Sequence, residues 1–268
     1  MYQRLFIVLL FLIGGAPRAG AQSSASSNVY IFPLFVDGAA AGASYRSTLK
    51  VNRLSGSTTM ACTLTQRNTS ASFTGVSGYF YPAYVVDAGF SPASETPVNF
   101  YPYLPWEILK TNGQSALQTG YAKLSCPATV QAQLQISLSN AQSNKLGEAT
   151  IAPATQGVSF QFLMDRRDGT RLGFSLINDS VTGGQFALIA RDQFNFEVNR
   201  QYDIIEPWSQ VSRFVDQMFT QPPLPPDFVG SIEVVGVTSG EKNYAVGLQY
   251  TGTVFTTIQP LVRSTPLP

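Results

Sequence analysis

The sequence predicts an all-β protein built from two tandem antiparallel β-sandwich domains with one short helix. Three observations support this prediction. Apolar and polar residues alternate along short segments such as 130–138, which places one face of a strand in a core and the other in water. Turn-forming pairs such as Asp168-Gly169 separate these segments. One pattern also occurs twice, since residues 45–51 are echoed 125 positions later by residues 170–176.

The first 21 residues predict a signal peptide. Arg4 precedes an unbroken apolar run over residues 5–13, and Ala19-Gly20-Ala21 forms a small-residue cleavage site before Gln22. The run is shorter than the roughly 20 apolar residues of a spanning helix, which disfavours the alternative of an uncleaved anchor. We therefore expect a mature chain that starts near Gln22 and has no transmembrane anchor. It would be secreted, periplasmic or at the cell surface.

The domain organisation follows from the repeat. We predict a first sandwich over residues 22–142 and a second over residues 143–268, with the boundary in a stretch of little apolar periodicity between 140 and 157. Residues 120–124 match residues 230–234, and Trp106 matches Trp208. The first domain contains an additional segment over residues 73–106, which is rich in aromatic residues and divided by prolines.

One segment is typical of a helix rather than a strand. Apolar residues from Val211 to Phe219 recur with the spacing of one helix face, which predicts a helix near 209–219. Ser209 is a candidate N-cap, and Pro222-Pro223 prevents continuation. We expect this helix to close the core of the second sandwich, and the alternative is an exposed partner helix.

Cys62 and Cys126 are the only cysteines in the chain. In an exported protein an even pair indicates a disulfide. Each cysteine is in phase with the apolar residues of its own strand, so both thiols should point into the core of the first domain. The bond would stabilise the fold by about 4 kcal/mol in the chain-entropy model.

Composition excludes several classes of function. The chain has no histidine, which excludes Ser-His-Asp and Cys-His catalysis and histidine-ligated metal sites. The net charge is +1 and becomes −1 when Arg4 and Arg18 are removed (15 cations against 16 anions), so we expect no nucleic-acid partner. Asp165, Asp168 and Asp179 match no calcium-loop spacing, and we predict no metal site and no cofactor.

The aromatic segment is the best candidate for a ligand-binding surface. Tyrosine and tryptophan combine a flat apolar face with a polar edge, which suits sugar rings or protein partners. The same rings could instead pack against the first sandwich or the seam between the domains, because large apolar side chains are usually buried. The candidate binding residues are Tyr79, Tyr81, Tyr84, Tyr101, Tyr103 and Trp106.

A pair of carboxylates for glycoside hydrolysis is the alternative site. That chemistry needs two acids roughly 5 to 10 Å apart, one of them desolvated. The spacing in the sequence marks no such pair among the available glutamates, which are Glu95, Glu107, Glu148, Glu206 and Glu233.

Six short motifs support a resemblance to a family. They are FPLFVDG at 32–38, YRSTL at 45–49, DGTRLG at 168–173, PDFVGS at 226–231, GLQYTG at 247–252 and FTTI at 255–258. With these motifs the chain resembles exported bacterial proteins of uncharacterised function that carry tandem immunoglobulin-like domains. The resemblance covers most of the mature chain. It implies immunoglobulin-like sandwiches and no shared active site.

These observations predict a non-catalytic structural or binding protein of the envelope or extracellular space. It would act by surface contacts in adhesion, matrix assembly or carbohydrate binding, and its partner would be a protein or carbohydrate of unknown identity. The alternative is a secreted glycan-active enzyme that uses a carboxylate pair.

Overall fold

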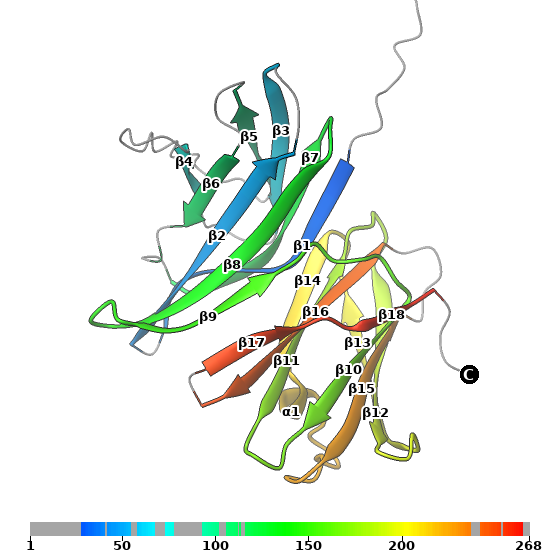
Figure 1. The fold of residues 1–268 in the computed structure, drawn as a ribbon. Coiled ribbons are helices and arrows are strands. Elements are labelled where there is room, and N and C mark those ends of the chain that lie inside the picture. The colour runs from blue at the N-terminus through cyan, green and yellow to red at the C-terminus, as the bar shows by residue number, and fades with distance from the viewer. Residues whose placement is uncertain are drawn as a thin grey trace, which may run out of the picture.

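The computed structural model describes residues 28–40, 42–54, 58–67, 73–77, 93–101, 106–111, 113, 116–236, 242–252 and 254–264. The chain forms two halves made almost entirely of antiparallel strands, which Figure 1 colours from blue to green and from green to red. The predicted all-β sandwich class with one short helix is therefore confirmed. The predicted signal peptide lies outside the described residues.

The described strands of the first half form two sheets. Sheet I has the order β1-β7-β3-β5, and sheet II has the order β4-β6-β2-β8-β9. β1 belongs to both, because residues 28–37 pair with β7 and residues 38–40 pair with β2. The strands are β1 (Asn28–Ala40), β2 (Ala43–Arg53), β3 (Met60–Arg67), β4 (Phe73–Ser77), β5 (Ala93–Phe100), β6 (Trp106–Thr111), β7 (Gln118–Cys126), β8 (Val130–Asn140) and β9 (Lys145–Ile151).

The second half also forms two sheets. Sheet III has the order β14-β11-β16-β17, and sheet IV has the order β13-β12-β15-β10-β18. The elements are β10 (Ser159–Asp165), β11 (Arg171–Asn178), β12 (Gly184–Asp192), β13 (Glu197–Ile205), β14 (Ser209–Phe214), α1 (Val215–Met218), β15 (Val229–Gly236), β16 (Asn243–Thr251), β17 (Val254–Ile258) and β18 (Leu261–Arg263).

The two halves repeat the same strand pairings. The first half pairs β1–β7, β7–β3, β3–β5, β2–β6, β2–β8 and β8–β9. In the same order, the second half pairs β10–β15, β15–β12, β12–β13, β11–β14, β11–β16 and β16–β17. Among the described strands, β4 and β18 have no counterpart. The sequence repeat is therefore also a repeat of topology.

The register of the repeat differs from the sequence echo at the tryptophans. The sequence echo aligns β2 with β11 at an offset of 125, so Asn52 corresponds to Ile177. Trp106 pairs with Asn52, and Gln210 pairs with Ile177. Trp106 therefore corresponds to Gln210, two positions beyond the Trp208 that the sequence comparison had matched to it.

The chain crosses between the halves later than the predicted boundary at residues 142 and 143. That boundary lies in the turn between β8 and β9, and β9 pairs with β8. Ala149 and Ile151 on β9 are buried in the core of the first half. We therefore place the crossing between Ile151 and Ser159, where β10 starts the sheet of the second half.

Apolar residues of both halves meet at the boundary between the halves, which we call the seam. Val246, Leu248 and Phe255 of the second half belong to the buried cluster that forms the core of the first half. Elsewhere along the seam, Ile31 and Tyr121 pack with Ile177 in a separate buried cluster. The outer face of sheet I therefore packs against the outer face of sheet III, and β9 lies beside β17 (Figure 1).

Polar groups also join the halves across this seam. The Tyr121 hydroxyl donates to Asp179 Oδ1 at 3.0 Å, and Lys123 Nζ lies 2.8 Å from Asp179 Oδ2. The Pro33 carbonyl accepts from Ser175 Oγ at 2.6 Å and from Gln210 Nε2 at 2.7 Å. Because these groups are buried or partly buried, the contacts fix the position of one half on the other.

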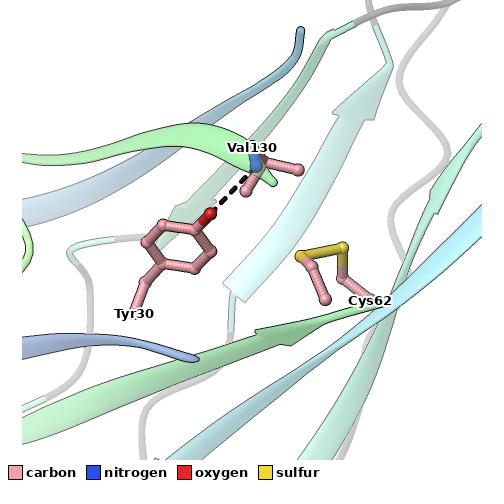
Figure 2. The surroundings of a disulfide bond; sticks show 4 residues. Tyr30, Cys62 and Val130 are labelled. Carbon is pink, nitrogen blue, oxygen red and sulfur yellow. Dashed lines mark hydrogen bonds between the residues drawn. A yellow bond between two sulfur atoms is a disulfide. The ribbon is translucent and has the colours of Figure 1, made fainter. Parts of the chain in front are cut away.

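The predicted disulfide between Cys62 and Cys126 is confirmed. It joins β3 to the end of β7 inside the first half, and both residues are buried. Figure 2 shows the bond beside a hydrogen bond from the Val130 backbone N–H to the Tyr30 hydroxyl, at 2.9 Å. The start of β8 is thereby attached to β1 close to the cross-link.

The helix is shorter than the apolar spacing suggests. Only Val215–Met218 is helical, whereas Ser209–Phe214 extends as β14 and pairs with β11. The backbone groups of this segment complete an edge of sheet III, which a longer helix would leave unpaired. Val215 and Phe219 are buried in the second core, as expected for a helix that closes it.

Candidate functional site

The predicted aromatic site is only partly within the described residues. Tyr79, Tyr81, Tyr84 and Tyr103 lie outside them. Tyr101 follows β5 of sheet I and is 49% exposed, and Trp106 opens β6 of sheet II and is 40% exposed. These two rings therefore lie on different sheets, and both present a large fraction of their surface to solvent.

Trp106 lies on an open face of sheet II that we call the Trp106 face. Pairing places Trp106, Asn52 and Gln131 in one row across β6, β2 and β8. The next row with the same orientation holds Ile108, Lys50 and Gln133. The Trp106 face consists of these six side chains.

Strand alternation explains why these side chains point outward. On the same three strands, Leu49, Val51, Leu109 and Leu134 lie at positions that alternate with this face, and they are at most 2% exposed. Since successive side chains of a strand point to opposite faces, the burial of these positions turns their neighbours toward solvent. The scaffold beneath the face is a packed core, so its rows are held rigidly.

The Trp106 face is hollowed between its rows. Its six side chains, with Val51, line a depression of about 310 Å³. Three antiparallel strands span about 10 Å, and the two rows are about 7 Å apart. A depression of these dimensions fits one or two sugar rings or a short peptide segment, and its volume is at the lower end of the range for ligand sites.

The amides around Trp106 are available to a ligand. Within the described part of the chain, we find no hydrogen bond from the side chains of Asn52, Gln131 or Gln133 to another protein group. Each amide can donate two hydrogen bonds and accept through its oxygen, and the Lys50 ammonium adds donors. The face therefore combines an aromatic platform with polar groups of both kinds.

The Trp106 face differs in composition from the equivalent face of sheet III, which lies in the seam between the halves. The corresponding face of sheet III is covered by the first half, and it carries Val246 and Leu248 where sheet II carries Gln133 and Gln135. At the position of Trp106 the covered face carries Gln210, which bonds to the Pro33 carbonyl. The exposed face of sheet II therefore has polar residues where the covered face of sheet III has apolar ones, and an aromatic residue where the covered face has a glutamine.

Alternation along residues 130–138 predicts an exposed face on that strand but does not connect this face with Trp106. The alternation of Gln131, Gln133 and Gln135 identifies an exposed face of β8. The neighbours of that face depend on the pairing of β6 with β2 and of β2 with β8. Residues as distant as Trp106 and Gln131 give no local signal of such pairing.

A second hollow, of about 870 Å³, lies beside β10 and β15 in the second half. Asp165 and Asp192 both line it. Hydrogen bonds from Arg167 hold the pKa of Asp165 at about 2, so this carboxyl group is ionised and unsuited to act as a general acid near neutral pH. Asp192 Oδ1 accepts the backbone N–H groups of Phe194 and Phe196 and organises the turn before β13.

The glutamates considered for hydrolysis occupy separate elements. Glu148 pairs with Lys145 on β9, and Glu206 is exposed after β13. Glu233 is completely buried, where Ser159 Oγ donates to it at 2.6 Å and Arg191 Nε lies 3.5 Å away. Glu95 lies on β5 and Glu107 on β6. Among the described pockets, none brings two of these glutamates together.

The aspartates considered for calcium take different partners. Asp179 bonds to Tyr121 and Lys123 in the seam, Asp165 pairs with Arg167, and Asp168 precedes the turn residue Gly169, which has a φ of 70°. In the part of the chain that the structure describes, no group of three or more acidic, cysteine or histidine side chains gathers in one place.

Comparison of the chain with protein-family models, with curated proteins and with solved structures gave no match in any of the three cases. Over the described residues, the structure contains no helix of the length and apolarity needed to cross a membrane. The disulfide is compatible with an extracellular or periplasmic location.

Proposed function

We propose that the protein is an exported, non-catalytic binding protein of immunoglobulin-like sandwich type, and that its Trp106 face holds carbohydrate. The single observation that carries the proposal is the half-exposed Trp106 ring surrounded by unpaired amides on a rigid sheet. Sugar rings offer an apolar C–H face for the indole and hydroxyl groups for the amides.

Export is supported by two independent features. The N-terminal 21 residues have the pattern of a signal peptide. The disulfide between Cys62 and Cys126 is typical of proteins that fold in an oxidising compartment.

The test uses Trp106 itself as the reporter. The chain has only two tryptophans, and Trp208 lies under the Arg67 guanidinium, 4.5 Å from its ring centre, at the seam. Trp208→Phe keeps an aromatic ring there and leaves Trp106 as the sole indole. An array of neutral and acidic oligosaccharides, followed by fluorescence titration of the positive sugars, should show a Trp106 emission change that saturates on binding.

Two variants complete the test. Trp106→Ala should weaken binding at least roughly tenfold, because it removes the stacking platform. Phe194→Ala is the matched control, since Phe194 is 70% exposed on the second half and away from the Trp106 face. Unchanged binding by Trp106→Ala, or the absence of any bound sugar, would contradict the proposal.

A further inference from the structure

The second half ends in a strand edge that is exposed and apolar. β13 is the last strand of sheet IV, and among the described strands only β12 pairs with it. Its outward side chains include Val198, Tyr202 and Ile204, which are 48%, 55% and 64% exposed. An unpaired edge with exposed apolar side chains can add another strand by main-chain hydrogen bonds.

The first half shows how this fold protects the same edge. β5 is the counterpart of β13, and the repeat register aligns Glu95 with Arg200, Pro97 with Tyr202 and Asn99 with Ile204. Both edges carry a charged residue at the first of these positions, so the difference is Pro97, which has no N–H to donate to an added strand. The chain therefore protects one of two equivalent edges and leaves the other open.

The open edge is also held rigidly for pairing. Ala187, Ile189 and Val235 form a buried cluster on the outer face of β12 and β15, next to β13. On the other face, Asn199 Nδ2 donates to the Pro222 carbonyl at 2.7 Å, and Arg213 lies 3.5 Å from Asp203. Little conformational entropy would be lost when a partner strand binds.

We propose that β13 pairs antiparallel with β13 of a second copy of this chain, with a two-fold axis at Gln201. This register pairs all nine residues of the strand. Glu197 of each copy lies opposite Ile205 of the other, and Gln201 lies opposite its own copy. On the exposed face it sets Val198 opposite Ile204 and Arg200 opposite Tyr202. The first is an apolar cross-strand pair, and the second places a cation beside an aromatic ring.

Neighbouring registers are less favourable. An axis at Arg200 would set Arg200 opposite itself and Glu197 opposite Asp203, which are like-charge pairs. An axis at Tyr202 would set Arg200 opposite the apolar Ile204 and leave Glu197 and Val198 beyond the ladder. The chemistry of β13 is thus self-complementary about Gln201, which specifies a second copy rather than an unrelated strand.

The first test is the oligomeric state of the mature chain by sedimentation equilibrium. We expect a reversible monomer–dimer equilibrium. Tyr202→Pro copies the protection found on β5 and should lower the association constant more than roughly tenfold. Ile204→Lys should act in the same direction and serves if the proline variant does not fold. Leu163→Lys is the matched control, because Leu163 is 77% exposed on β10, and this variant should still dimerise.

The second test determines the register. Gln201→Cys would face its own copy at about 5 Å between Cα atoms, within reach of a disulfide, and should cross-link on mild oxidation. Arg200→Cys would lie about 8 Å from its copy and should not cross-link. A chain that is monomeric at every concentration, a dimer insensitive to both β13 variants, or cross-linking through residue 200 in place of 201 would each overturn the proposal.

Discussion

Replacement of Asp179 by alanine tests whether the seam between the halves contributes to stability. Asp179 follows β11 in the second half, and its carboxylate bonds to Tyr121 and Lys123 on β7 of the first half. The Asp179 and Tyr121 side chains are almost completely buried, at 3% and 0% exposed. Burial, the Asp179 charge and the bond to Asp179 all raise the pKa of Tyr121 above its usual value, so the phenol stays protonated and donates.

The expected magnitude follows from the groups left without partners. Removing one member of a buried ion pair costs about 3 to 5 kcal/mol, and a buried hydroxyl without an acceptor costs about 1 to 3 kcal/mol. Lys123 is 27% exposed and regains part of its hydration in the variant, which favours the lower end. We expect Asp179→Ala to lower the free energy of unfolding by about 3 kcal/mol.

Urea denaturation with the disulfide intact measures this change. Asp179→Asn is the matched variant, since an amide oxygen still accepts from Tyr121 while the charge opposite Lys123 is lost, and it should cost less than the alanine. Asp203→Ala breaks a partly exposed pair with Arg213 and should change stability by less than about 1 kcal/mol. If Asp179→Ala costs no more than Asp203→Ala, the argument that the seam is a buried polar junction is refuted.

Three further predictions concern single features of the fold. The disulfide between Cys62 and Cys126 joins residues 64 positions apart, so its reduction should lower the free energy of unfolding by about 4 kcal/mol. Equal denaturation midpoints with and without reductant would contradict this. Gly230→Ala should lower the stability measured by thermal unfolding by at least about 2 kcal/mol, because the new Cβ would lie 2.0 Å from the Arg191 carbonyl oxygen. An unchanged melting temperature would show that β12 and β15 can move apart to accommodate the methyl group. Burial raises the pKa of Tyr250 from 10.0 to about 12, so the stability that it contributes is complete below about pH 10 and is lost as the pH rises through about 12. Denaturation at a series of alkaline pH values should show this decline, and Tyr250→Phe should make it shallower.

Strand positions and the faces of strands were predictable because they depend on local alternation. The period of two along residues 130–138 predicted the buried and exposed sides of β8, and the phase of Cys62 and Cys126 predicted that both thiols reach one core. The helix was less predictable. Spacing over residues 211–219 suits one helix face, yet β11 offers backbone partners to Ser209–Phe214, and this non-local pairing shortened the helix to one turn.

The candidate site shows the same division. Trp106 was a candidate from its residue type, whereas Lys50, Asn52 and Gln133 entered only through the registers of β6 with β2 and of β2 with β8. These strands are separated by long stretches of chain. Their alignment depends on the packing of the whole half, which no short window of sequence reports.

The sequence by itself determined the all-β class, the repeat, the cross-linked cysteines and the side of each strand that faces a core. Alternation, the phase of the cysteines and turn-forming residues are local signals, so a short window of sequence is enough to recognise them. Tertiary structure alone decided that sheet I covers sheet III, that Asp179 meets Lys123, and that Trp106 stands among amides. These contacts join residues that are far apart in the sequence. They depend on the packing of the whole chain, because the most favourable burial of apolar surface decides which strands and sheets meet.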